Sequence, residues 1–262
     1  MRKIFSSLFS IIIANFLFIT IATAQPEADE VLKSFFQFMP SPIEMTSLVK
    51  DNNIAYDAQL LNKISNQKYY ADDYKQAVNL GVYSTDLGYA TIYTKPDALS
   101  YLNVVKVLAD SLSVGNYINI ETIQKLALSN NLNQLLSETA MTFEKINDHL
   151  INNKKPQTAA FMLIGGWAET VYLTARVAQV ANDNTLINSK VVEQKFVLDE
   201  LIKAIEPYKK DRDMNDLLYE LNKIKVEMDK AFSLLEKNGA VKLDEIAELN
   251  KLINNFRDKL VL

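Results

Sequence analysis

Two carboxylates in this chain lie in unusual surroundings, each of them three residues before a tyrosine in a glycine-bearing segment. Asp86 precedes Tyr89 in LGVYSTDLGYATIY, and Glu169 precedes Tyr172 in LIGGWAETVYL. Two carboxyl groups roughly 5–10 Å apart in an open cleft can act as acid and base, as they do in glycoside hydrolysis. One hypothesis is therefore that the protein is a hydrolase that uses Asp86 and Glu169 as its acid and base.

Two other hypotheses explain the same residues without catalysis. In the first, which we favour, tyrosine hydroxyls and Arg176 satisfy two buried carboxylates whose burial would otherwise be costly. In the second, the cluster binds a small polar ligand, such as a sugar or an organic cation, through hydrogen bonds, stacking and cation–π contacts. The ligand-binding candidates are Tyr83, Asp86, Tyr89, Trp167, Glu169, Tyr172 and Arg176. We predict no catalytic residue.

Glycines are the second unusual feature of these segments. Gly81 and Gly88 lie in the first segment and Gly165 and Gly166 in the second, although a glycine inside a helix costs about 1 kcal/mol relative to alanine. Residues three and four apart share a helix face, so Gly81 and Gly88 belong to a narrow stripe of small residues. We expect this stripe to pack closely against Gly165 and Gly166, which would bring the two carboxylates into one neighbourhood.

Composition excludes several kinds of site. The chain has no cysteine and a single histidine, His149, so it has no thiolate metal site, no disulfide and no paired-histidine metal pattern. A Ser-His-Asp triad would have to use His149, which we expect instead to flank the apolar face of its helix. No phosphate loop or nucleophile elbow is present. We therefore predict neither a metal nor another cofactor.

The N-terminus follows the pattern of a secretory signal peptide. Arg2 and Lys3 precede an apolar run over 4–21, and the tripeptide ATA ending at Ala24 is a small-residue cleavage site before Gln25. We expect cleavage after Ala24 rather than an uncleaved anchor, no stable membrane insertion afterwards, and a periplasmic or secreted protein. Cleavage reduces the 28 basic residues to 26 against 32 acidic ones, a net charge near −6, which disfavours nucleic acid as a partner.

Apolar residues recur every three or four positions along most of the mature chain, and no segment alternates as a strand would. We therefore predict an all-α fold, a multi-helix bundle in one domain over 25–262. Helices are expected to begin at Pro42, after Pro96 and at Pro156, the last continuing to about Val180. Shorter helices are expected over 28–38, 58–64 and 120–128.

The strongest periodicity is in the C-terminal part of the chain. Two series of apolar residues span 214–235 and 243–260, and Asn238-Gly239 between them is typical of a helix stop with glycine in the left-handed conformation. These features predict a terminal antiparallel helical hairpin. Asp211 or Asp213 is expected to cap its first helix.

A weak internal repeat relates two parts of the mature chain. Asp86-x-x-Tyr89 recurs as Glu169-x-x-Tyr172 at an offset of 83 residues. This offset suggests two quasi-repeated helical halves, over about 71–153 and 156–237, with chance similarity as the alternative.

Five segments of the chain carry a resemblance to a known group of proteins. They are MPSPIE at 39–44, YDAQLLN at 56–62, AVNLGVYSTDLGYAT at 77–91, YLNVVKVLADSLSV at 101–114 and GGWAETVYL at 165–173. Together they resemble an uncharacterised family of exported helical proteins and lipoproteins of Bacteroidota. The resemblance implies export and a helical fold but no activity, and Gln25 stands where many members carry a lipid-modified cysteine. We expect an accessory protein that binds a protein or small molecule, or is structural, rather than an enzyme.

Overall fold

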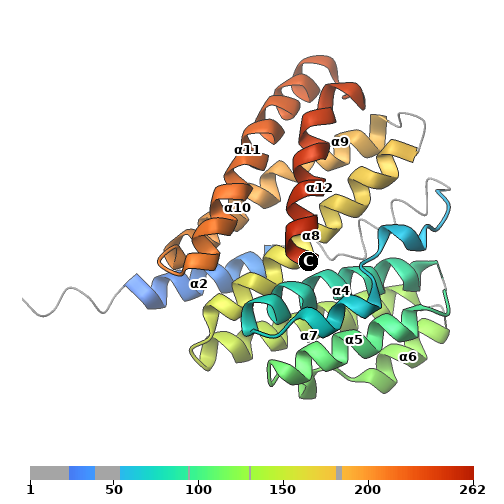
Figure 1. The fold of residues 1–262 in the computed structure, drawn as a ribbon, viewed down its shortest axis with the longest axis vertical. Helices are drawn as coiled ribbons and strands as arrows, with labels where there is room; N and C mark the ends of the chain where they lie inside the picture. Colours follow the sequence, from blue (N-terminus) through green and yellow to red (C-terminus); the bar gives the residue numbers. More distant parts are fainter. Residues whose placement is uncertain (1–23, 39–53, 94, 130, 181–184) are drawn as a thin grey trace, which may run out of the picture.

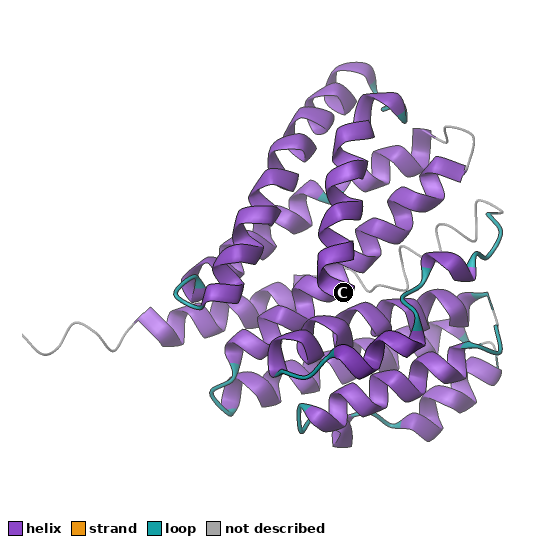
Figure 2. Ribbon diagram, in the orientation of Figure 1, coloured by secondary structure: helices purple, strands orange, loops and turns teal. Residues whose placement is uncertain are grey.

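The fold is all-α. The computed structural model describes residues 24–38, 54–93, 95–129, 131–180 and 185–262, and these residues form helices and no strand (Figures 1 and 2). The α-helices are α2 (Ala24–Phe38), α4 (Asp73–Ile92), α5 (Ala98–Ser111), α6 (Ile120–Leu128), α7 (Leu132–Asn152), α8 (Pro156–Val180), α9 (Thr185–Glu193), α10 (Lys195–Ile205), α11 (Arg212–Asn238) and α12 (Ala247–Val261). The predicted multi-helix bundle is confirmed.

Helix α8 is the central element of the bundle. Its 25 residues give it a length of about 37 Å, and it contacts α4, α7, α9, α10 and α12. In Figure 1, α4 to α7 gather at one end of the molecule and α9 to α12 at the other, with α8 extending through both groups. Nearly all of α8 and most of α4 is buried, so neither helix has a polar face of the kind that a surface helix shows.

The α4 and α8 backbones touch at their glycines, as predicted. A Cβ atom on Gly81 would lie 2.1 Å from the Met162 carbonyl oxygen, and one on Gly165 would lie 1.9 Å from the Val78 carbonyl oxygen. Such distances leave no room for any side chain, so the absence of a Cβ at these two positions is what permits the approach. Gly88, which we expected in the same contact, lies further along α4 and lines a cavity instead.

The helix ends confirm the expected local signals. The Asp211 side chain caps α11 by accepting a hydrogen bond from the Met214 amide at 3.0 Å. At the other end of α11, Gly239 has φ of 72°, the left-handed conformation in which glycine is favoured. Helix α12 then returns along α11 as the predicted C-terminal hairpin (Figure 1).

Some sequence expectations are corrected and others cannot be compared. The helix expected over 58–64 is two short 3₁₀-helices, Ala58–Leu60 and Ile64–Tyr69. The helix expected over 120–128 has those bounds as α6, whereas α9 and α10 were not predicted. The start at Pro42 and the leader through residue 23 lie outside the described residues.

Three further 3₁₀-helices connect the longer elements. They are η3 (Gly115–Tyr117), η4 (Glu206–Tyr208) and η5 (Asp244–Ile246). Over the part of the chain that the structure describes, no helix combines the length and apolarity needed to cross a bilayer.

Candidate functional site

Asp86 and Glu169 meet in the core, one turn beyond the glycine contact. Asp86 projects from α4 and Glu169 from α8, and both side chains have 0 % exposure. The two carboxyl groups are close enough for Glu169 to raise the pKa of Asp86, but a hydrolytic acid and base also need an open cleft. The close helix packing therefore brings them together in a sealed position, without an open cleft.

Arg257 of α12 is the cation that compensates this pair. Its Nε donates to Glu169 Oε2 at 2.9 Å and an Nη donates to Glu169 Oε1 at 3.1 Å, a two-pronged geometry that only arginine can provide. Burial works to lower the pKa of Arg257, but Glu169 outweighs it and the pKa is raised. The guanidinium also lies 4.6 Å above the Tyr172 ring, within cation–π range.

The sequence assigned this role to Arg176, and that assignment is wrong. The Arg176 guanidinium donates from Nη1 to Gln179 Oε1 at 2.9 Å, one turn further along α8, and its Nε has no hydrogen-bond partner. Arg257 takes the position because α12 packs against α8 beside Glu169. The apolar periodicity of α12 did contain a signal for a buried arginine, because Arg257 directly follows Phe256 and lies on the apolar side of that helix.

Asp86 is the protonated member of the cluster. Burial is the main cause that raises its pKa well above the ordinary value, and the neighbouring Glu169 adds to it, against smaller opposing effects of Arg257 and the Asn62 amide. Asp86 Oδ2 accepts from the Asn62 amide at 3.0 Å, whereas Oδ1 receives no hydrogen bond from a donor of the protein. A proton on Asp86 that is shared with Glu169 satisfies both groups, and the cluster is then electrically neutral.

The tyrosines around this cluster hold a segment of irregular backbone. Tyr83 donates to the Lys63 carbonyl oxygen at 2.7 Å, Tyr93 to that of Ile54 at 2.6 Å and Tyr101 to that of Asn62 at 3.2 Å. Tyr89 accepts from the Asp57 amide at 3.2 Å. Residues 54–63 contain few backbone hydrogen bonds of their own, so these hydroxyls satisfy groups that a regular helix would pair internally.

Two buried asparagines and Tyr70 extend the network to the C-terminus, and sequence reasoning missed all three. Asn79 donates to the Leu260 carbonyl oxygen at 2.9 Å, and Tyr70 to that of Val261 at 3.1 Å. Asn62 joins them by donating to Tyr70 and Asn79 at 3.0 and 3.3 Å. These bonds satisfy carbonyls that the last turn of α12 would leave unpaired.

The remaining candidate, Trp167, does not reach the cluster of hydrogen bonds. It is 3 % exposed, and its Nε1 has no hydrogen-bond partner in the described part of the structure. The structure thus places Tyr83, Asp86, Tyr89, Trp167 and Glu169 in the core, and leaves Tyr172 and Arg176 half-buried. No group of three or more metal-ligating side chains occurs among the described residues.

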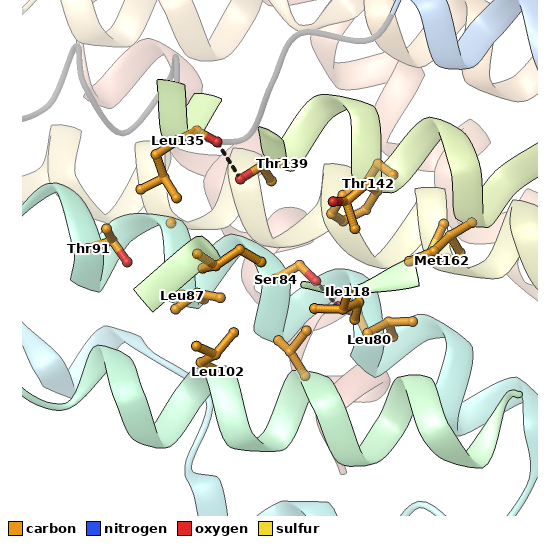
Figure 3. Close-up of a pocket in the computed structure, with 15 residues that line it drawn as sticks. Leu80, Ser84, Leu87, Thr91, Leu102, Ile118, Leu135, Thr139, Thr142 and Met162 are labelled. Atoms are coloured by element: carbon orange, nitrogen blue, oxygen red, sulfur yellow. Dashed lines mark hydrogen bonds between the residues drawn. The ribbon is translucent and has the colours of Figure 1, made fainter. Parts of the chain in front are cut away.

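A separate, mainly apolar cavity lies beside α4 and is lined by none of the residues of this cluster (Figure 3). It has about 40 Å³ open to the centres of water molecules and about 580 Å³ of atom-free space in total. The walls come from α4, α5, α6, α7 and α8 and from the residue after η3. The lining residues are Leu80, Ser84, Leu87, Gly88, Thr91, Leu102, Val105, Ile118, Ile123, Leu135, Thr139, Thr142, Phe143, Ile146 and Met162.

Four hydroxyl side chains lie at the cavity wall, those of Ser84, Thr91, Thr139 and Thr142, and two of them are bonded to their own helices. Ser84 donates to the Leu80 carbonyl oxygen at 2.7 Å, and Thr139 donates to that of Leu135 at 2.7 Å (Figure 3). Neither hydroxyl proton is available for a ligand, and none of the lining side chains is charged. The cavity therefore offers an apolar surface, the kind that stays free of water and takes apolar molecules.

His149 lies near one end of this cavity, one turn beyond Ile146 on α7. Its Nδ1 is 2.7 Å from the Tyr117 hydroxyl and 3.2 Å from Asn153 Nδ2. These contacts place the histidine beside the core as a hydrogen-bonded residue.

Comparison with protein-family models, with curated proteins and with solved structures finds no match to this chain.

Proposed function

We propose that this protein is an exported, non-catalytic binding protein that holds an apolar small molecule in the cavity beside α4. The observation that carries the proposal is the cavity itself, a partly enclosed space whose lining is mainly apolar and uncharged, with two of its four hydroxyl groups bonded to their own helices. Export is supported by the leader-like first 24 residues and by the resemblance to exported helical proteins.

The state of the acid cluster supports a structural role for it in this proposal. A glycosidase or a polar-ligand site needs carboxylates that a substrate can reach, whereas Asp86 and Glu169 have no exposed surface. Their hydrogen-bonding capacity is directed to each other, to Arg257 and to backbone groups. Such a network favours one arrangement of the core.

Ligand binding can be tested by filling the cavity. Ser84→Leu places an isobutyl group in the cavity, and Ser111→Leu is a matched control because both hydroxyls bond the carbonyl four residues earlier but Ser111 faces solvent. We expect decanol or decanoate to raise the melting temperature of the wild type and of Ser111→Leu, and to leave Ser84→Leu unchanged, since ligands that bind only the native state stabilise it.

Two results would contradict the proposal. One is that no apolar compound shifts the wild-type melting temperature, and the other is an equal shift in Ser84→Leu.

The export half of the proposal is tested separately by the mass of the protein recovered from the periplasm or medium of an expressing bacterium, which should correspond to a chain that begins at Gln25.

A further inference from the structure

The shape of the cavity narrows the class of ligand, provided that the proposed binding function holds. Along α4 the lining runs from Leu80 to Thr91, and along α7 from Leu135 to Ile146. Each stretch covers eleven residue steps, or about 16 Å of helix. The two helices run in opposite directions beside the cavity, with Thr91 near Leu135 at one end and Leu80 near Met162 at the other (Figure 3). The space is therefore elongated along both helices.

The cavity is also narrow. The volume that can hold the centre of a water molecule is only about 40 Å³. Spread along a lining of about 16 Å, so small a volume fits a single row of atoms better than a bulky group. A compact or planar polycyclic molecule would have to push α4, α5 and α7 apart, and well-packed helices resist such displacement.

The chemistry of the wall excludes polar ligand groups from the interior. A sugar or peptide placed there would lose its hydrogen bonds to water and find no charge and few hydroxyl groups in exchange. A hydrocarbon has no such loss, and each methylene that leaves water contributes about 0.8 kcal/mol.

We infer that the ligand is a molecule with a single unbranched alkyl chain, such as the acyl chain of a fatty acid or lipid, held lengthwise between α4 and α7. The polar end of that molecule stays outside the apolar slot. Leu87, Thr139 and Phe143 are the half-exposed members of the lining, so the opening lies between these two helices.

A chain-length series tests this inference. Dissociation constants are measured by calorimetry for hexanoate, octanoate, decanoate, dodecanoate and tetradecanoate. We expect affinity to rise roughly fourfold for each added methylene, the factor equivalent to about 0.8 kcal/mol, and to level off once the chain fills the slot. Adamantane carboxylate and 2-naphthoate, which have compact or planar rings, should bind at least tenfold more weakly than decanoate.

Substitutions at one end of the slot locate the chain. Thr91→Leu and Leu135→Phe both shorten the space at the Leu135 end, so each should lower the chain length at which affinity levels off and leave hexanoate binding in place. Ser111→Leu should reproduce the wild-type series. Two independent variants protect the test against misfolding of one of them, which circular dichroism detects.

The outcomes separate this inference from the function on which it depends. Ring compounds that bind as tightly as decanoate, or a series without chain-length dependence, would overturn the chain inference and leave apolar binding standing. Failure of every compound would overturn both. The class of molecule that carries the alkyl chain is then found by comparing the affinities of decanol, decanoate and a lysophosphatidylcholine with a decanoyl chain. The compound that binds most tightly identifies the ligand as an alcohol, a free fatty acid or a membrane lipid.

Discussion

At the scale of single residues, the two neighbouring carboxyl groups at the centre of the cluster differ in their hydrogen-bond partners. Glu169 is paired with Arg257 on both oxygens, whereas Asp86 faces only the Asn62 amide and Glu169 itself. One cation cannot neutralise two buried anions, so the group without the guanidinium keeps its proton. Asp86 thus behaves as a neutral hydrogen-bond donor inside the core.

This protonation has a measurable consequence for stability. Because burial and Glu169 raise the pKa of Asp86 in the folded state, folding retains a proton that the unfolded chain releases. Its contribution to stability is present below the ordinary carboxyl pKa and is lost as pH rises toward the folded pKa, by up to about 1.4 kcal/mol per pH unit. Asp86→Asn keeps the neutral donor, so we expect it to be more stable than wild type near pH 8, with the gap closing toward pH 4.

Urea unfolding at a series of pH values measures this difference. Asp97→Asn is a suitable control because that carboxyl group is half-buried and lies outside the cluster. A loss of stability in Asp86→Asn that grows with pH would mean that Asp86 is ionised in the folded protein and would contradict the assignment.

At the scale of elements, the contact between α4 and α8 depends on two particular glycines and not on glycine content. Gly165 lies against the Val78 carbonyl, whereas the neighbouring Gly166 has 3.8 Å between its added Cβ position and the nearest atom, an ordinary contact. Gly165 therefore has no space for a side chain, whereas Gly166, the next residue on α8, has space for a methyl group.

Alanine substitutions should expose this contrast. Gly165→Ala would force the backbones of α4 and α8 apart, and we expect a loss of more than about 2 kcal/mol in the free energy of unfolding. Gly166→Ala should be neutral or stabilising by up to about 1 kcal/mol, because alanine favours the helix and finds space. Chemical denaturation of both variants measures the effect, and equal losses would show that the helix contact is not the reason for the glycines.

At the scale of the whole molecule, the C-terminal helix α12 bonds residues that lie far earlier in the chain. Arg257 reaches Glu169 on α8, and the last carbonyls of α12 accept hydrogen bonds from Tyr70 and Asn79, more than 180 residues earlier in the sequence. The polar cluster is complete only when this last helix is docked. Its removal would leave Glu169 and Asp86 without their cation.

A double-mutant cycle tests the role of this ion pair. Arg257→Met leaves Glu169 buried and unpaired, and we expect it to lower the free energy of unfolding by about 3–5 kcal/mol. Adding Glu169→Gln removes the stranded charge but keeps an oxygen that accepts from Asp86, so the double variant should recover much of that loss. Arg212→Met, at an exposed position, should change stability by less than about 0.5 kcal/mol. A double variant as unstable as the sum of its singles would argue against a direct pairing.

Much of the architecture was readable from the sequence because its causes are local. The all-α class follows from apolar periodicity, the ends of α11 from Asp211 and Gly239, and the bounds of α6 from residues within it. The meeting of Asp86 with Glu169 was also predictable, since glycines inside two helices require a close partner.

The tertiary structure alone decided which groups complete these features. Arg257 lies 88 residues from Glu169, and its place on the apolar side of α12 does not show which carboxylate it pairs with until α12 has docked. The backbone at 58–69 forms two short 3₁₀-helices instead of one α-helix, and tyrosines of α4 and α5 bond the Asn62 and Lys63 carbonyls between them. The cavity arises where five helices fail to fill the space between them. Sequence determines which faces are apolar, but only packing in three dimensions determines where those faces leave a gap.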